Sequence, residues 1–232
     1  MKFFIIIKEE SERLPNKNFL NLNGIPLYKH LLNELESVDV YVDTDSDRII
    51  DECKTLTNVI CYKRDLRFIE MENNVDFEVS PVLFMIENFL NKFVTDDDEI
   101  IITPHVTSPF IKLKTILKAT EMLTKGYDTV CACTEHKEFT YFKGQPVNFN
   151  SEVVPKTQDL EPVVMGNGAF FIFTKKVFMK NKNRTDENNY FYPIQAPESI
   201  EIDDLEDFKL AELYVLRNSF YESIFGRDNA NS

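Results

Sequence analysis

The chain opens with the apolar run Phe3-Phe4-Ile5-Ile6-Ile7, and the polar stretch Ser11-Glu12-Arg13-Leu14-Pro15-Asn16-Lys17-Asn18 follows it closely. A short apolar run bounded by polar residues predicts a buried strand. Lys8, Arg13 and Lys17 come after that strand, where backbone N–H groups and cations can together hold phosphate groups. This segment therefore predicts a phosphate-binding loop. The alternative is an ordinary solvated turn that contains a proline.

Strand and helix signals alternate over the next 130 residues or so, as in a doubly wound α/β fold. We expect a mostly parallel, Rossmann-like sheet with helices on both faces. The expected strands are residues 3–7, 38–42, 59–62, 99–103 and 128–134, and the expected helices are 26–36, 46–55, 78–93 and 113–123. Ser46 is the expected N-cap of the second helix.

The alternation changes after about residue 135. There the sequence predicts a hairpin over 139–149, strands over 169–173 and 190–194, and a helix over 205–216. We expect one domain over 1–225, with 135–200 as an inserted lobe and 226–232 as a disordered tail. Apolar surface on the lobe favours a homodimer, and the alternative is ordinary core. The phenylalanines concerned are Phe139, Phe142, Phe149, Phe170, Phe171 and Phe173.

The composition limits which binding partners and which cellular location we expect. A formal net charge of −13 argues against nucleic acid and against an anionic membrane surface as partners. No apolar run approaches the ~20 residues of a membrane span, and the apolar N-terminal run is too short for a signal peptide. Cys53, Cys61, Cys131 and Cys133 form no metal-binding spacing, so we expect free thiols. A cytoplasmic protein is predicted.

Polar loops follow the predicted strands at residues 8–19, 43–46, 63–70 and 103–109. Because ligands of open α/β sheets bind outside the carboxyl ends of the strands, these loops should surround the site. They carry cations and hydroxyl groups despite the acidic total, which favours a nucleotide or a sugar acid as ligand. The residues concerned are Lys8, Arg13, Lys17, Asp45, Lys63, Arg64, Arg67, Thr107 and Ser108.

A second acidic segment, Glu198-Ser199-Ile200-Glu201-Ile202-Asp203-Asp204, precedes the last predicted helix. In an extended backbone Glu201 and Asp203 point to the same side, and two close carboxylates repel unless a cation lies between them. Mg²⁺ suits such oxygen ligands. The alternative is that Asp203 or Asp204 only caps the helix, and different residues can fill the two roles.

Six short motifs together resemble the CMP-sialic acid synthetase (acylneuraminate cytidylyltransferase) family, which includes the CMP-Kdo synthetases. The resemblance spans about residues 3–215. It implies a nucleotidyltransferase-type fold and a homodimer. It also implies a Mg²⁺-dependent reaction of CTP with an acidic sugar that gives a CMP-sugar and pyrophosphate, for surface-polysaccharide synthesis. The motifs are Arg13-Leu14-Pro15-Asn16-Lys17-Asn18, Val42-Asp43-Thr44-Asp45-Ser46, Thr107-Ser108-Pro109, Gln158-Asp159-Leu160, Asn167-Gly168-Ala169 and Ser199-Ile200-Glu201-Ile202-Asp203.

The resemblance also implies roles for individual residues. Arg13, Lys17 and Asp203 would be catalytic, and Glu201 with Asp203 would hold the metal. Arg64 would lie near the cytosine, and Thr107 and Ser108 near the acceptor. The implied substrate-binding residues are Lys8, Ser11, Asn18, Arg64, Ser80, Thr107, Ser108, Gln158 and Asn167.

This sequence departs from the family pattern at several positions. Lys8 replaces an arginine, Glu12 stands where a lysine is usual, and Glu201 replaces an aspartate. An arginine that sialate enzymes direct at the sugar is missing near Lys156 and Thr157. The acceptor therefore stays open among a nonulosonic acid, Kdo, another sugar acid and a phosphonate. Two alternatives also stay open: a nucleotidyltransferase with another base or acceptor, and a non-catalytic relative.

Overall fold

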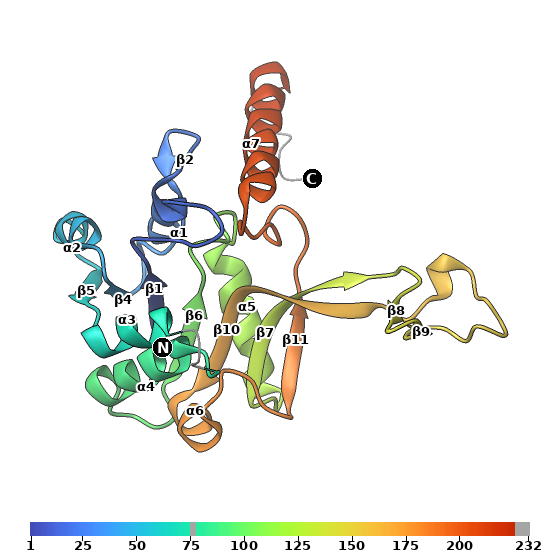
Figure 1. Ribbon diagram of the computed structural model, residues 1–232, viewed down its shortest axis with the longest axis horizontal. Helices are drawn as coiled ribbons and strands as arrows, with labels where there is room; N and C mark the ends of the chain where they lie inside the picture. The colour runs from blue at the N-terminus through green and yellow to red at the C-terminus, as the bar shows by residue number, and fades with distance from the viewer. Residues whose placement is uncertain (75–77, 226–232) are drawn as a thin grey trace.

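The computed structural model describes residues 1–74 and 78–225. A seven-stranded sheet forms its centre, with the strand order β11-β7-β10-β6-β1-β4-β5 (Figure 1). In the described sheet β10 runs antiparallel to both neighbours, and the other strands are parallel to one another. The strands are β1 (Lys2–Ile7), β4 (Val40–Thr44), β5 (Val59–Lys63), β6 (Ile100–Pro104), β7 (Thr129–His136), β10 (Val163–Thr174) and β11 (Asn189–Pro193).

Strand β1 lies inside the sheet, between β4 and β6. Phe3, Ile5 and Ile7 contribute to the core on one face of the sheet, while Phe4 packs on the other face. A parallel strand covered on both faces needs apolar residues at successive positions, which explains the unbroken run Phe3–Ile7. The predicted first strand is confirmed.

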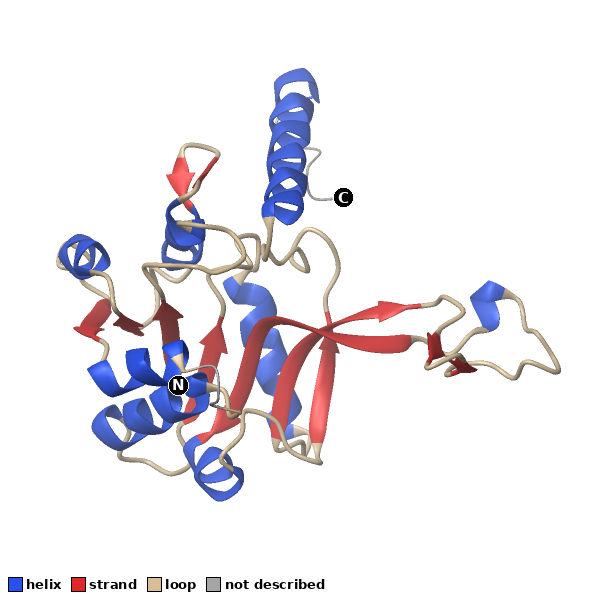
Figure 2. Ribbon diagram, in the orientation of Figure 1, coloured by secondary structure: helices blue, strands red, loops and turns tan. Residues whose placement is uncertain are grey.

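Helices cover both faces of the sheet (Figure 2). One core holds side chains of α1 (Leu27–Glu34), α2 (Asp47–Cys53) and α5 (Leu113–Thr124). The other holds side chains of α3 (Leu66–Asn73), α4 (Pro81–Phe93) and α6 (Lys175–Asn181). This three-layer arrangement confirms the doubly wound, mostly parallel fold. The Oγ of Ser46 accepts a hydrogen bond from the N–H of Ile49, as its expected capping role requires.

Four short elements, α3, α6, β2 (Asn21–Leu22) and β3 (Ile25–Pro26), were not predicted from the sequence. Helix α3 begins after Asp65, whose side chain accepts from the N–H of Arg67, and α6 begins after Thr174, which caps Val177. Strands β2 and β3 form a small hairpin. Helices α3 and α6 have only eight and seven residues, which is too short for a clear helical period.

An arm leaves the sheet where β7 and β10 continue past their neighbours toward β8 (Tyr141–Phe142) and β9 (Gln145–Pro146) (Figure 1). The 3₁₀ helix η2 (Thr157–Asp159) lies in the segment between β9 and β10. The predicted lobe 135–200 is therefore too wide. Its strands β10 and β11 belong to the central sheet, because β10 pairs with β6 and β7 and β11 pairs with β7.

The last helix, α7 (Leu205–Phe225), is longer than the predicted 205–216. Its first turns pack Phe208 and Ala211 against Leu14, Leu22 and Leu27, so the helix is fixed beside the loop that follows β1. The predicted tail 226–232 lies outside the described residues. Within residues 1–74 and 78–225, no helix has the length and hydropathy that crossing a membrane requires.

Candidate active site

A cavity of about 640 Å³ opens at the carboxyl ends of β1 and β6. Lys8, Ser11, Arg13, Lys17 and Asn18, all from the segment after β1, line it. Residues of β6 and the loop after it line another wall, including Thr103, His105 and Thr107. Apolar side chains of α3 and α4 complete the lining: Ile69, Val82 and Ile86. The cavity thus lies at the sheet edge that the sequence indicated.

The loop after β1 is held in place by its own polar side chains. Asn18 donates its side-chain N–H to the carbonyl of Lys8 (2.8 Å), and Lys17 Nζ donates to the carbonyl of Ile202 (3.0 Å). Asn16 adopts a left-handed conformation (φ 54°), which asparagine tolerates better than most residues, and the 3₁₀ helix η1 (Lys17–Phe19) follows it. The loop therefore presents Arg13 and Lys17 from a fixed backbone.

Each of the three cations from this segment is paired with a carboxylate. Arg13 Nη2 lies 2.7 Å and Lys17 Nζ lies 3.3 Å from Asp203 Oδ1, and Lys8 Nζ lies 2.9 Å from Glu72 Oε1. The structure thus brings together the three residues predicted to be catalytic, Arg13, Lys17 and Asp203. An incoming polyphosphate would have to compete with these carboxylates for the cations.

Glu201 and Asp203 flank the buried Ile202, whose N–H donates to the carbonyl of Thr107 (2.8 Å). Thr107 Oγ1 donates to Glu201 Oε1 (3.3 Å). A Cβ atom at Gly168 would approach Glu201 Oε1 to 3.0 Å, so a residue without a side chain is needed there. Residues 201–203 have no regular secondary structure, so the expected strand-like backbone stays a prediction.

These two carboxylates fit the donor set of Mg²⁺. In the part of the chain that the structure describes, no cluster of three or more His, Cys, Asp and Glu side chains is arranged to hold a metal. Mg²⁺ commonly takes one or two carboxylates and completes its octahedron with water and substrate phosphates. Both side chains are partly exposed and can accept such a shared ion.

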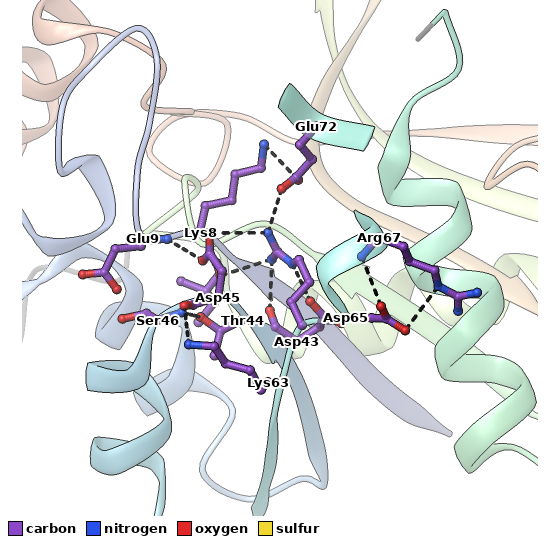
Figure 3. A network of polar contacts seen from close by, with 12 residues as sticks. Lys8, Glu9, Asp43, Thr44, Asp45, Ser46, Lys63, Asp65, Arg67 and Glu72 are labelled. Carbon is purple, nitrogen blue, oxygen red and sulfur yellow. Dashed lines mark hydrogen bonds and ion pairs between the residues drawn. The ribbon is translucent and has the colours of Figure 1, made fainter. Parts of the chain in front are cut away.

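The acidic residues of the first loop do not all face the same way. Glu10 and Glu12 are exposed and line the cavity, where they oppose the approach of an anion. The backbone N–H of Glu9 donates to Asp45 Oδ1 (2.7 Å), and its carboxylate points away from Asp45 (Figure 3). Two of the three carboxylates of this segment, Glu10 and Glu12, therefore lie at the site.

Arg64 does not contact the cavity, which corrects its expected place near the base. Its side chain is fully buried and donates to Asp43 Oδ1 (2.7 Å), Glu72 Oε2 (3.0 Å) and the carbonyl of Ile7 (3.2 Å). Figure 3 shows the polar network that contains Asp43 and Glu72, the two carboxylates that Arg64 contacts. Arg64 has no surface left for a nucleotide, so its role here is to hold β1, β4 and α3 together.

Four other expected substrate contacts lie away from the cavity lining. Ser80 is exposed immediately before α4, and Gln158 is exposed in η2 on the arm. Ser108 is fully buried. Asn167 lies next to Gly168, and its side-chain Oδ1 accepts from the N–H of Ala169 (3.2 Å). Asn167 is thus close to Glu201, whereas Gln158 is remote within one chain.

His105 and Arg184 line the cavity, although neither had a place in the sequence-based site. His105 follows β6 directly, and Arg184 lies in the loop between α6 and β11. A histidine directly after a predicted strand was a usable signal. No such signal marked Arg184 in the sequence, because this residue belongs to a polar loop far from every motif.

Comparison with known proteins identifies the family. A family model described as "Cytidylyltransferase" matches residues 5–223. The chain belongs to the cytidylyltransferase family. This confirms the resemblance that the six motifs indicated.

Among relatives of this cytidylyltransferase-family chain, N-acylneuraminate cytidylyltransferase of Streptococcus agalactiae serotype III (strain NEM316) is 25% identical over 226 residues. That alignment covers 91% of this chain and 51% of the relative. N-acylneuraminate cytidylyltransferase A of Danio rerio is 26% identical over 237 residues, covering 97% of this chain and 52% of the relative. The chain spans about half the length of the curated relatives it matches.

Solved structures share the fold. A CMP:2-keto-3-deoxy-manno-octonic acid synthetase complexed with CTP superimposes with a TM-score of 0.60 at 13% identity, covering 93% of this chain and 98% of the other. A 4-diphosphocytidyl-2C-methyl-D-erythritol synthase from Anaerococcus prevotii DSM 20548 gives 0.58 at 16% identity, with the same coverages. At these identities the comparison supports the architecture alone.

Proposed function

We propose that this chain transfers CMP from CTP to an acidic sugar or a related anionic acceptor and releases pyrophosphate. The observation that carries the proposal is the cavity at the carboxyl ends of β1 and β6, where Arg13, Lys17 and Asp203 meet. Family membership supplies the reaction class. The names of the relatives support an acylneuraminate or a similar sugar acid as the acceptor.

In this reaction an acceptor oxygen forms a new bond to the α-phosphorus while the bond to the pyrophosphate oxygen breaks. The electron pair stays on pyrophosphate, and the hydroxyl proton passes to solvent. Positioning and charge neutralisation therefore supply most of the rate. Lys8, Arg13 and Lys17 are placed to stabilise the charge that grows on the leaving group.

Arg13 and Lys17 can do so only after they exchange a partner. Both side chains pair with Asp203 Oδ1 in the described structure, and a triphosphate would replace that carboxylate as their partner. We propose that Glu201 and Asp203 then hold Mg²⁺. The ion would neutralise phosphate charge when bound. This role agrees with the position of Asp203, which contacts Arg13 of the first loop and directly follows Ile202, whose carbonyl accepts from Lys17.

The test is direct binding of CTP, UTP, ATP and GTP by calorimetry, each with and without Mg²⁺, followed by pyrophosphate release with a panel of sugar acids. We expect selective binding of CTP and pyrophosphate release only when a sugar acid is present. Selective binding of another nucleotide would favour a nucleotidyltransferase of different base preference. Absence of binding for all four would contradict the proposal and favour a non-catalytic relative, in which Glu10 and Glu12 repel phosphate.

We also propose a homodimer and a cytoplasmic location. Tyr141, Phe142, Val153 and Val154 are exposed on the arm, an apolar surface that a second copy could cover. The four cysteines are free thiols, as suits a reducing compartment. CMP-sugar production in that compartment would supply surface-polysaccharide synthesis.

A further inference from the structure

Arg184 places a partly buried positive charge in the cavity wall. Its guanidinium lies 4.0 Å from the ring centroid of Phe171 on β10, and Nη1 lies 3.2 Å from Nε2 of His105. Burial lowers the pKa of Arg184 to about 10, which still leaves the group charged at neutral pH. The residue also lines the same cavity as Lys8, Arg13 and Lys17.

Among the described residues, Arg184 differs from the other lysines and arginines of the cavity lining in its partners. Lys8, Arg13 and Lys17 each lie within ion-pair distance of a carboxylate. Arg184 has no ion pair with a carboxylate in the described part of the chain, and its side chain contacts the ring of Phe171 and Nε2 of His105. A partly buried cation without a counter-ion loses part of its hydration, which an anionic ligand would compensate.

The surroundings of the guanidinium favour a flat anion. Phe171 covers one face of the group, so further ligands must approach its edge, where the N–H donors lie. An arginine can only donate, so Nε2 of His105 accepts from Nη1, and the ring proton lies on Nδ1. That Nδ1 is 3.7 Å from Glu201 Oε1. His105 thereby orients Arg184 and lies between it and Glu201, the proposed metal ligand.

The position also separates this charge from the first loop. Phe171 belongs to β10, and β6 lies between β10 and β1. Lys8, Arg13 and Lys17 follow β1. A ligand held at the first loop and a ligand held at Arg184 would therefore lie side by side across the end of β6, where Thr107 and Glu201 are found.

We infer that Arg184, oriented by His105 and Phe171, binds the carboxylate of the acceptor. The inference rests on the proposed function and deepens it by naming the recognised group. One guanidinium balances the single charge of a carboxylate and matches its two oxygens. A phosphonate dianion would call for a second cation, and no other cation contacts Arg184 in the described residues.

The experiment compares wild type with Arg184→Gln, and uses Lys180→Gln as a control because Lys180 is an exposed residue on neighbouring α6. Calorimetry measures CTP binding, steady-state assays measure KM for N-acetylneuraminate and for 2-keto-3-deoxy-manno-octonate, and saturation-transfer NMR measures binding of both acids without nucleotide. We expect Arg184→Gln to raise the acceptor KM by about 10- to 100-fold and to abolish the NMR signal. The affinity for CTP should stay within about twofold of wild type, and Lys180→Gln should match wild type.

The outcomes separate the two proposals. Unchanged acceptor KM in Arg184→Gln, or CTP binding by a wild type that binds neither acid, would overturn the inference and leave the proposed function standing. Acid binding that depends on Arg184 without any CTP binding would support the inference and overturn the proposed function. Binding of neither ligand would overturn both. If Arg184→Gln does not fold, Arg184→Lys keeps the charge without the bidentate edge, and a wild-type KM in that variant would contradict the inference.

Discussion

Arg64 shows how a charge that looks functional in sequence can serve stability. Its side chain and that of Asp43 are both fully buried, and they contact each other at 2.7 Å. Replacing Arg64 by Met would leave Asp43 buried without its partner. We expect a loss of about 3–5 kcal/mol in the free energy of unfolding, measured by urea denaturation at pH 7.

The control for Arg64→Met is the adjacent Lys63→Met. Lys63 lies on the surface and pairs with the exposed Asp47 at 2.6 Å, so its loss should cost at most about 1 kcal/mol. Equal, small losses for the two variants would show that the buried network does not hold β1 and β4 together.

For Asp203 we expect the opposite: a substitution there should change ligand binding rather than folding. Asp203→Asn removes the charge that holds Arg13 and Lys17, so CTP should bind more tightly without Mg²⁺. With Mg²⁺ the same variant should lose most of its turnover, by about 100-fold or more, because a metal ligand is gone. Calorimetry with and without the ion and pyrophosphate release give the two readouts.

Asp204→Asn is the matched variant for this experiment. Asp204 Oδ1 accepts from the N–H groups of Glu206 and Asp207 as a helix cap, and asparagine caps equally well. It should behave as wild type. Full Mg²⁺-dependent turnover in Asp203→Asn would remove Asp203 from the metal site.

The sequence predicted the placement of the first-loop residues and failed for Arg64, and both results have a physical reason. Lys8, Arg13 and Lys17 follow a strand whose end must face the ligand edge. Arg64 also follows a strand, but β5 is an edge strand and the carboxylates that capture its side chain come from β4 and α3. Which carboxylate captures a given arginine depends on tertiary contacts that no local pattern records.

Helices α1 and α2 are joined by a charge cluster at Glu52. Glu52 accepts from Tyr28 and pairs with Lys29 of α1 (2.5 Å) and Arg48 of α2 (3.0 Å). Burial opposes ionisation, but hydrogen bonds from Lys29, Tyr28 and Arg48 outweigh it and lower the pKa of Glu52 from 4.5 to about 2. The ionised form therefore stabilises the contact between the two helices.

The sign of the pH effect follows from this lowered pKa. The stabilisation is complete above the ordinary pKa of 4.5 and disappears as the pH falls toward about 2. Wild type should exceed Glu52→Gln in free energy of unfolding at pH 6, and the difference should shrink between pH 5 and 2. Urea denaturation across that range checks it.

Asp51→Asn provides the comparison for Glu52→Gln, because Asp51 is exposed and pairs only with Lys54 in the described helix. Its difference from wild type should be small at every pH. A wild-type advantage over Glu52→Gln that is constant from pH 6 to pH 2 would mean that the charge on Glu52 does not contribute.

Long elements were predicted from their periodicity, and short ones were not. Strands β1, β5 and β7 and helix α5 lie close to their expected bounds. Strands β1 and β7 contain runs of buried residues, and α5 buries Ile116, Ala119 and Met122 at helical spacing. Strand β10 was expected as 169–173 and begins at Val163, since its first half leaves the core and carries Gly166 and Gly168. Half of that strand is held by pairing with β7, which a local pattern cannot reveal.

The arm gives the molecule an exposed apolar surface away from the cavity. Phe142 has 67% and Tyr141 61% of its surface exposed, at the end where β8 and β9 project (Figure 1). If two copies associate through this arm, Phe142→Asp should bury a charge at the contact. We expect the dimer dissociation constant to rise by about tenfold or more, measured by analytical ultracentrifugation.

Leu66→Asp is the matched variant, because Leu66 is 73% exposed on α3 and lies outside the arm. It should associate as wild type does. A monomeric wild type, or equal dissociation constants for the two variants, would contradict the arm as an interface.

The strand order has a consequence for synthesis on the ribosome. Strands β1, β4, β5 and β6 are neighbours in the described sheet and are complete once Pro104 has emerged. Both neighbours of β7 in that sheet, β10 and β11, are translated after it. Strand β7 (Thr129–His136) therefore has no partner strand in this sheet until β10 (Val163–Thr174) has been synthesised and pairs with both β7 and β6. We expect nascent chains that stop between residues 137 and 162 to display an open strand edge and to depend on chaperones.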